Sequence, residues 1–254
     1  MALLEVEQVS VQFGGLKALS NFSFALDVGE LVGLIGPNGA GKTTAFNVVT
    51  GVYPPTAGTI RFDSRSIGGE KPFRINRLGI ARTFQNIRLF AGLSVLDNVL
   101  VSFNQSIGHG FLGTVIRSKK HLREDAQHER EAFELLDVFG LADRANLLAS
   151  NLPYGDQRRL EIARALATKP KVLLLDEPAA GMNPQEKIDL TNLIRQVRRQ
   201  FQVGIWLIEH DMKLVMNLVD RLTVLDHGET IAVGTPGEVQ ANPKVIEAYL
   251  GEPV

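Results

Sequence analysis

The chain contains no cysteine, which excludes disulfide bridges, thiolate metal sites and a cysteine nucleophile. It has no uninterrupted apolar run near the eighteen or so residues that a membrane-spanning helix needs. Its opening segment, MALLEVEQVS, lacks the basic stretch that begins a signal peptide. We therefore expect a protein that lies in the cytoplasm or is held at a membrane only by a partner.

Neither sign of charge is in excess. The 27 basic and 28 acidic side chains leave a net charge of -1, whereas proteins that bind nucleic acid regardless of its sequence carry a basic excess. We therefore expect no nucleic-acid partner. With 254 residues, of which 44% are hydrophobic, the chain can form one large domain or two small ones with an ample core.

The strongest motif that is present lies near residue 40. Leu31–Ile35 is an apolar run of strand length, residues 36–43 (GPNGAGKT) fit the pattern G-x-x-x-x-G-K-[ST], and a segment with helical periodicity follows. This is the context of a phosphate-binding loop, in which backbone N–H groups and the helix N-terminus bind the anion. Lys42 would reach the β- and γ-phosphates, and the Thr43 hydroxyl would ligate Mg²⁺. A glycine-rich turn with a surface lysine is the weaker alternative, so the sequence predicts a nucleoside triphosphate site.

Two other predicted strands end in titratable side chains. Residues 171–176 (KVLLLD) are typical of a strand buried on both faces of a parallel sheet. The run ends in two adjacent acids, Asp176 and Glu177, and since desolvating a charge is costly, a buried strand rarely ends in this way by accident. In a magnesium–nucleotide protein Asp176 suits the metal and Glu177 suits activation of a water molecule. Two solvated loop acids are the alternative. Residues 203–208 form a similar strand shortly before His210, although a lone histidine there is more often structural.

Three further positions are weak signals on their own. Phe13 closes a strand predicted over residues 4–13, and its ring either plugs the strand end or stacks on adenine. Gln85 follows a strand predicted over residues 80–84 and by itself is an ordinary loop residue. Gly155 stands at the start of a helix predicted to run to about residue 168, whose bare N–H groups could bind an anion.

A helical block that begins near residue 93 interrupts the α/β pattern and predicts a second lobe. Its charged segment, residues 118–139, has a broken helical stripe of apolar residues. The stripe consists of Leu122, Ala126, Phe133 and Leu136.

The remaining segments predict strands and helices of ordinary length. Further strands are expected over residues 22–28, 59–63, 221–226 and 229–233, and further helices over residues 94–104 and 243–250. Asn183 has the place of an N-cap before Pro184 and Glu186. The helix that it begins presents one apolar face, formed by Leu190, Leu193, Ile194, Val197 and Phe201.

Taken together, these segments resemble the ATPase subunit of an ATP-binding-cassette (ABC) transporter over nearly the whole chain. The matching positions are the adenine-stacking aromatic Phe13, the Walker A loop at residues 36–44, the Q-loop Gln85, the signature motif at residues 152–157, the Walker B strand at residues 172–176, the catalytic Glu177, the D-loop at residues 180–183 and the switch His210. Walker motifs occur in many nucleotide hydrolases, so the signature, Gln85 and His210 narrow the likeness to this family.

The resemblance implies an α/β fold, with a P-loop NTPase (RecA-like) core, an antiparallel β subdomain and an inserted α-helical signature subdomain. Residues 1–254 would form a single ABC nucleotide-binding domain. Residues 1–87 and 166–254 would form its ATP-binding α/β core, and residues 88–165 its helical signature lobe.

The resemblance also implies a site for ATP and Mg²⁺. Glu177 and His210 would be catalytic. The metal would be held by Thr43, Gln85 and Asp176. The nucleotide would be bound by Phe13, Gly36, Asn38, Gly39, Gly41, Lys42, Thr43, Thr44, Gln85, Tyr154, Gly155 and Asp156.

Two motifs depart from the family pattern. In the signature, usually Leu-Ser-Gly-Gly-Gln, Pro153 replaces the serine, Tyr154 the first glycine and Asp156 the glutamine. Contact with a γ-phosphate would then rest on Gly155 and its helix terminus. In the D-loop Asn183 replaces the usual aspartate, which keeps a helix cap but not the charge.

Within the family the likeness is strongest to the ATPases of branched-chain amino-acid importers. It rests on residues 154–164, 176–184, 208–216 and 234–236 and on an insert at residues 103–130. It implies ATP hydrolysis that powers uptake of branched-chain, or related hydrophobic or neutral, amino acids. The implied partners are membrane permease subunits, a second ATPase subunit (identical or sibling) and, indirectly, a periplasmic or extracellular substrate-binding protein, with the chain peripheral on the cytoplasmic face of the membrane. The alternatives are another ABC system such as lipopolysaccharide export, a soluble non-transport ABC ATPase and a small-molecule kinase.

Overall fold

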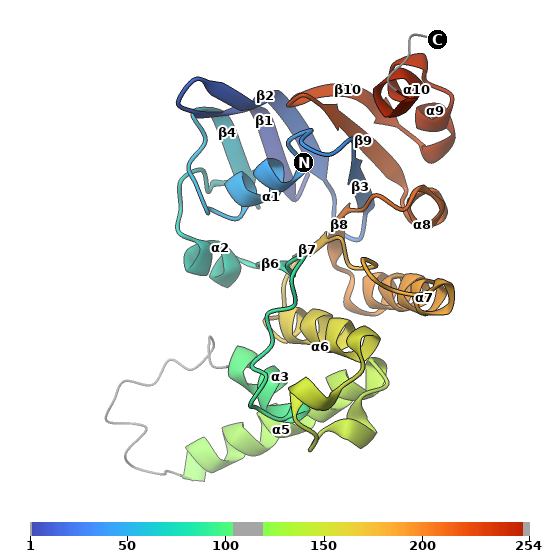
Figure 1. The fold of residues 1–254 in the computed structure, drawn as a ribbon. Helices are drawn as coiled ribbons and strands as arrows, with labels where there is room; N and C mark the ends of the chain where they lie inside the picture. Colours follow the sequence, from blue (N-terminus) through green and yellow to red (C-terminus); the bar gives the residue numbers. More distant parts are fainter. Residues whose placement is uncertain (1, 104–118, 251–254) are drawn as a thin grey trace. The chain divides into compact units, whose positions relative to one another are not determined.

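The computed structural model describes residues 2–103 and 119–250 (Figure 1). Residues 104–118, which include much of the predicted insert, lie outside the described residues. The chain forms two compact units, one made of Met1–Gln85 and Lys171–Val254 and the other of Asn86–Pro170. The second unit extends beyond the lobe predicted over residues 88–165, because it takes in the end of helix α6 (Tyr154–Leu166) and the turn after it.

One sheet of the first unit is antiparallel, with the strand order β2-β1-β4-β5. Its strands are β1 (Leu4–Phe13), β2 (Leu16–Leu26), β4 (Ala57–Phe62) and β5 (Arg65–Ser66). The prediction that β2 begins at residue 22 is wrong, because Gly14, with a φ angle of +57°, closes a tight turn that pairs Phe13 with Leu16. Polar residues in the first half of β2 conceal its alternation in the sequence.

The other sheet is mostly parallel, with the order β10-β9-β3-β8-β7-β6. Its parallel strands are β3 (Leu31–Ile35), β6 (Ile80–Arg82), β7 (Val172–Asp176), β8 (Gly204–Ile208) and β9 (Arg221–Asp226). β9 and β10 (Glu229–Gly234) form the predicted hairpin. Every residue of β3, β7 and β8 is buried, as expected for strands covered on both faces. The carboxyl ends of these strands meet at one edge of the sheet, where Gly36, Glu177 and Glu209 follow.

Six helices are described in the first unit. They are α1 (Lys42–Val49), α2 (Pro72–Leu78), α7 (Pro184–Phe201), α8 (Met212–Leu218), α9 (Pro236–Gln240) and α10 (Pro243–Leu250). The predicted start of α7 is confirmed, because the Asn183 side chain accepts the Glu186 N–H at 3.0 Å and the Glu186 carboxylate accepts the Asn183 N–H at 2.8 Å. Of the predicted apolar face, Phe201 is 38% exposed because it stands at the helix end, and the other four residues are buried.

The second unit is helical. Its described residues form α3 (Val95–Phe103), α5 (Lys119–Val138), the 3-10 helices η2 (Ala142–Arg144) and η3 (Ala149–Asn151), and α6. The predicted apolar stripe of α5 is wrong in part, because Ala126 and Phe133 are exposed, and the side chain of Leu122 lies outside the described part of the chain. The face that packs against α3 and α6 follows an i, i+3, i+4 spacing nearer the end of the helix. It is formed by Ala132, Leu135 and Leu136.

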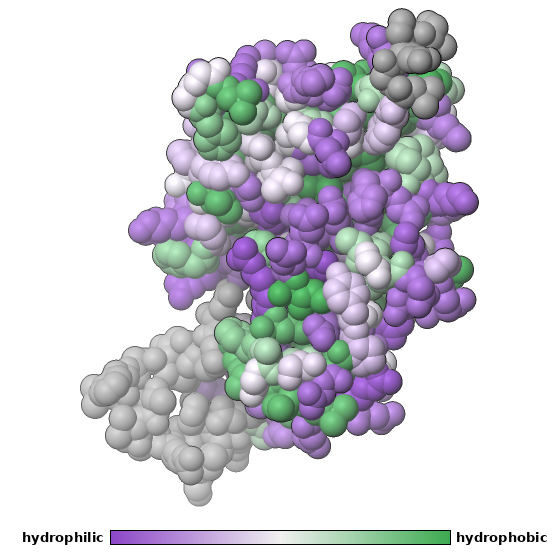
Figure 2. All heavy atoms as spheres, in the orientation of Figure 1, coloured by the Kyte–Doolittle hydropathy of each residue, from purple (hydrophilic) through white to green (hydrophobic). Residues whose placement is uncertain are grey.

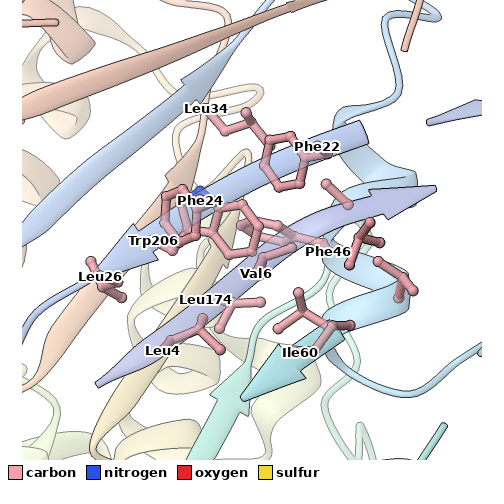
Figure 3. Close-up of a cluster of buried hydrophobic side chains, with 14 of the residues drawn as sticks. Leu4, Val6, Phe22, Phe24, Leu26, Leu34, Phe46, Ile60, Leu174 and Trp206 are labelled. Carbon is pink, nitrogen blue, oxygen red and sulfur yellow. The ribbon is translucent and has the colours of Figure 1, made fainter. Parts of the chain in front are cut away.

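The main hydrophobic core of the first unit joins its two sheets and α1 (Figure 3). Trp206 of β8 stacks on Phe24 of β2 with ring centroids 4.1 Å apart, and Phe46 of α1 approaches the same indole to 4.7 Å. Burying aromatic rings contributes most of the stability of such a cluster. Because α1 is anchored by Phe46 in this core, the loop that precedes α1 is also held in place.

Within the described residues, every helix is too short or too polar to cross a lipid bilayer. Figure 2 shows polar residues over most of the visible face of the first unit and hydrophobic residues gathered on the visible face of the second. Large exposed hydrophobic side chains of the second unit include Phe90, Leu93, Leu147 and Leu148. The segments that carry them lie side by side, since the Val95 N–H donates to the Leu147 carbonyl oxygen at 2.9 Å.

Candidate functional site

The loop between β3 and α1 is shaped by close approaches of the backbone. A Cβ atom on Gly36 would lie 2.0 Å from the Leu225 carbonyl oxygen, and one on Gly41 would lie 2.7 Å from the Ala18 carbonyl oxygen. Both glycines also have positive φ angles, +151° and +101°. A side chain at either position would displace the neighbouring strand, so the path of the loop requires glycine.

The first turn of α1 lines a pocket of about 400 Å³. The N-cap residue Gly41 offers no side chain to the first N–H groups of the helix, and the first turn carries no acidic residue. These N–H groups and the helix dipole therefore provide an anion site. Of the residues predicted to bind nucleotide or to act on it, the pocket brings together Asn38, Gly39, Gly41, Lys42, Thr43, Thr44, Gln85 and Glu177.

The Lys42 side chain is held against its own loop. Its Nζ atom donates to the carbonyl oxygens of Gly36 and Pro37 at 2.7 and 2.8 Å. Burial lowers the pKa of Lys42, while the negative charges of Glu177 and Asp176 partly oppose that change. A phosphate in the pocket would give this ammonium group a charged partner in place of two carbonyl groups.

Glu177 follows β7 directly, and its backbone has a φ angle of +47°. Its Oε2 atom accepts a hydrogen bond from Gln85 Nε2 at 2.9 Å and lies 3.8 Å from His210 Nδ1. The structure therefore brings Gln85, Glu177 and His210 together. Gln85 and Glu177 line the pocket, whereas the His210 side chain is exposed beside Glu177.

Asp176 is paired with an arginine that the sequence did not single out. Arg82 Nη2 donates to Asp176 Oδ2 at 2.7 Å, and Arg82 Nη1 donates to Asn47 Oδ1 at 2.7 Å and to Thr50 Oγ1 at 3.2 Å. The guanidinium also lies over the Phe46 ring, 5.4 Å from its centroid. This network ties the end of β7 to α1, and Asp176 itself does not line the pocket.

The family model described as "ABC transporter" matches residues 19–180, which contain the loop, Gln85 and Glu177. The chain belongs to the ABC transporter family. A second model, described as "Branched-chain amino acid ATP-binding cassette transporter", matches residues 229–254, where α9 and α10 lie.

Curated members of the ABC family align with almost the whole chain. The high-affinity branched-chain amino acid transport ATP-binding protein LivG of Salmonella typhimurium is 48% identical over 98% of both chains. The protein BraF of Pseudomonas aeruginosa, with the same description, is 44% identical over 98% of both chains. A crystal structure of an ABC transporter ATP-binding cassette in its ADP conformation has a TM-score of 0.85 and 31% identity, and the match covers 99% of this chain and 100% of that one. These relatives confirm the predicted α/β fold of a P-loop ABC ATPase.

The ABC signature motif falls at the start of α6, within the second unit. Pro153 is the N-cap of this helix and provides no side-chain cap, so Tyr154 and Gly155 stand in its first turn. The Tyr154 hydroxyl accepts from Arg158 Nη2 at 3.2 Å. Asp156 forms ion pairs with Arg144 and with Arg159. The positions of Tyr154, Gly155 and Asp156 are described within this unit, and their part in nucleotide binding stays a prediction.

Phe13 does not line the pocket. Its ring is 45% exposed and packs edge-to-face against Tyr53, with centroids 5.1 Å apart. This contact resembles the hydrophobic plug that the sequence left as one interpretation. Stacking of Phe13 on adenine stays a prediction.

The sequence did not identify several residues near the site. The pocket is also lined by Leu16, Lys17, Ala18 and His227. They come from the two hairpins that flank the loop. In the sequence only the turn residues of these hairpins can be recognised, and they predict a hairpin, not a binding site. Arg82 ends a short strand and has the pattern of a surface cation, although a charged residue within a buried strand indicates a buried partner.

Proposed function

We propose that the chain is the ATP-hydrolysing subunit of an ABC importer and that it powers uptake of branched-chain, or related hydrophobic or neutral, amino acids through a membrane permease. The observation that carries the proposal is the position of Glu177, which stands on the wall of the loop pocket with Lys42 and is held by Gln85. The class of transported molecule is supported by relatives named as branched-chain amino acid transport proteins, 44% and 48% identical over 98% of the chain.

The residues of the pocket fit ATP and Mg²⁺. The N-terminus of α1 lacks a side-chain cap and Lys42 supplies an ammonium group, so both offer donors to phosphate oxygens. Thr43 and Gln85 of the pocket lining would hold the metal together with Asp176, which lies outside that lining and is paired with Arg82. Their hydroxyl, amide and carboxylate oxygens are the hard ligands that Mg²⁺ prefers. The bound ion would neutralise charge on the phosphates.

Glu177 and His210 divide the chemistry between them. The Glu177 carboxylate would orient and polarise the attacking water, a general-base effect typically worth about 10²–10⁴ in rate. His210, with Nδ1 3.8 Å from that carboxylate, would hydrogen-bond the γ-phosphate. Lys42 would stabilise the charge that develops on the same phosphate.

Membrane attachment would come from partner proteins. The exposed hydrophobic residues of the second unit, Phe90, Leu93, Leu147 and Leu148, offer an apolar surface of the kind that mediates protein contacts. We assign this surface to the permease and place the chain on the cytoplasmic face of the membrane. A second ATPase subunit, identical or sibling, would complete each nucleotide site.

The experiment isolates the tagged chain with its permease from membranes and compares it with Glu177→Gln. The variant is expected to bind ATP as the parent does, because no phosphate ligand is lost, and to lose both phosphate release and leucine uptake into vesicles by about 10²–10⁴-fold. Glu134→Gln, the same change on an exposed position of α5, is the matched control and should leave both rates unchanged. If Glu177→Gln retains more than about a third of the parental rate of hydrolysis, the general base is a residue other than Glu177. Full ATP hydrolysis without uptake of leucine or of any other hydrophobic or neutral amino acid would contradict the proposed substrate class.

A further inference from the structure

Glu209 is a buried acid that the proposed chemistry does not use. It follows β8 directly, and the residue is 1% exposed. Its Oε1 atom accepts the Ala179 N–H at 2.8 Å, and its Oε2 atom accepts the His210 N–H at 3.1 Å. One carboxylate thus joins the segment after β7 to the segment after β8.

Burying this carboxylate has a free-energy cost. Burial raises the pKa of Glu209, while the backbone N–H groups of Ala179, His210 and Asp211 and the charge of the His210 imidazole act in the opposite direction because they stabilise the charged form. A neutral side chain at this position would avoid the cost. What the buried charge provides in return is its hydrogen bonds, and those to Ala179 and His210 go to the backbone of the two segments that carry Glu177 and His210.

The segment that Glu209 holds is strained at Glu177. A non-glycine residue with a φ angle of +47° carries a conformational cost of about 1–3 kcal/mol and persists only where neighbouring contacts fix it. On one side the Glu177 N–H donates to the Ile208 carbonyl oxygen at 2.9 Å. On the other side the Ala179 N–H is held by Glu209. These two contacts both come from the end of β8, in addition to the hydrogen bond from the Ala180 N–H to the Glu177 carbonyl oxygen at 3.2 Å.

The same carboxylate also fixes His210. Its bond to the His210 N–H fixes the backbone just after β8, and the imidazole lies with Nδ1 3.8 Å from Glu177 Oε2. Because one acid orients both backbones, the distance between the two catalytic side chains depends on it.

We propose that Glu209 is a positioning residue for ATP hydrolysis, which holds Glu177 and His210 in register through the Ala179 and His210 N–H groups. It does not line the pocket, so it acts on the rate of hydrolysis and leaves nucleotide binding unchanged. The inference rests on the proposed ATPase function.

The test is Glu209→Gln, which keeps the length and one carbonyl acceptor but turns an NH₂ group toward the other backbone N–H. We expect kcat to fall by about 10²-fold, as a misplacement of roughly 1 Å at a reacting group does, with KM for ATP and ATP affinity within about twofold of the parent. Glu134→Gln again serves as the exposed control. Steady-state phosphate release gives kcat and KM, and circular dichroism gives the folded fraction to which each rate is normalised.

A double-variant cycle separates positioning from a general loss of structure. In a His210→Ala background, Glu209→Gln should lower kcat by much less than 10²-fold, because part of its effect passes through His210. If Glu209→Gln does not fold, Glu209→Asp, which keeps the charge on a shorter side chain, takes its place with the same expected split between kcat and KM.

The outcomes distinguish this inference from the proposed function. If the parental chain, isolated with its permease, hydrolyses no ATP, the proposed function fails. If Glu177→Gln is inactive but the folded Glu209 variant keeps the parental kcat, or changes KM alone, the positioning role is overturned. An equal loss in the parent and His210→Ala backgrounds overturns the coupling to His210.

Discussion

Three acidic side chains at the ends of β7 and β8 are held by three different kinds of partner. Asp176 is paired with Arg82, Glu177 accepts from the Gln85 amide, and Glu209 accepts two backbone N–H groups. A buried charge without a partner costs several kcal/mol. The partner of each acid is therefore as much a part of the site as the acid itself.

Arg82→Met tests the first of these pairs. The two side chains are only 7% and 6% exposed, so removal of the guanidinium leaves Asp176 charged in a nearly buried position. We expect a loss of about 3 kcal/mol in the free energy of unfolding, since breaking a buried ion pair typically costs 3–5 kcal/mol. Urea unfolding of the nucleotide-free protein measures it through the fluorescence of Trp206, the one tryptophan in the chain.

The control removes both charges. In Arg82→Met with Asp176→Asn no charge is left unpaired, so most of the lost stability should return. A single variant that loses less than about 1 kcal/mol would show that solvent reaches Asp176 and that Arg82 is not needed to hold it.

At the scale of secondary structure, the site depends on where elements begin and end. β3, β7 and β8 end at one edge of the sheet, and α1 and α7 begin close after two of them. The start of α1 is left without a side-chain cap, whereas α7 begins with a complete capping box at Asn183. The first arrangement suits a bound anion and the second suits stability alone.

Asn183→Ala should destabilise the first unit by about 1 kcal/mol, because it removes the N-cap acceptor of α7. Asn183→Asp, which restores the residue usual in the family, should lie within about 0.5 kcal/mol of the parent, since aspartate caps as well as asparagine. Urea unfolding followed by Trp206 fluorescence checks both variants. Equal losses in the two variants would mean that the cap is not what Asn183 contributes.

Sequence reasoning found the elements whose residues carry a strong pattern. The buried strands β3, β7 and β8 were predicted from short continuous apolar runs, and the helix α7 from its capping residues and its apolar face. The helices α2, α8 and α9 were not predicted, since they are short and their tertiary contacts outweigh weak local signals.

Some residues of the candidate site could also be predicted from the sequence and others could not. The loop residues around Lys42 and the acid Glu177 were predicted, because glycine spacing and strand-end acids have a direct chemical reason. Arg82 and Glu209 were not, because their meaning depends on partners far away in the sequence, Asp176 and Ala179. The place of Arg82 in a buried strand indicates that it has a buried partner, but the sequence does not say which residue that partner is.

At the scale of the whole molecule, the nucleotide pocket belongs to the first unit and the signature helix α6 to the second. α6 begins at Pro153 without a side-chain cap, as α1 does. Unlike α1 it carries an acid, Asp156, in its first turn, and that charge is paired with Arg144 and Arg159, so we expect the first N–H groups of α6 to bind an anion as well. If both helix starts bind phosphate, one ATP per chain can occupy both only when the α6 start of one chain faces the ATP of another.

We predict that the signature acts on the ATP of a second subunit. The test uses two separately defective chains, Lys42→Ala and Gly155→Asp, both in a Glu177→Gln background that retains ATP. A mixed dimer then has one site with both defects and one site with an intact loop and an intact signature. If the motifs act between chains, mixing should restore ATP-dependent dimerisation, because each mixed dimer has one intact site. Light scattering measures the dimerisation. If they act within one chain, every copy keeps a defect and mixing restores nothing. The Glu177→Gln parent must dimerise in the same assay, and absence of rescue at concentrations where that parent dimerises would contradict the exchange of signatures.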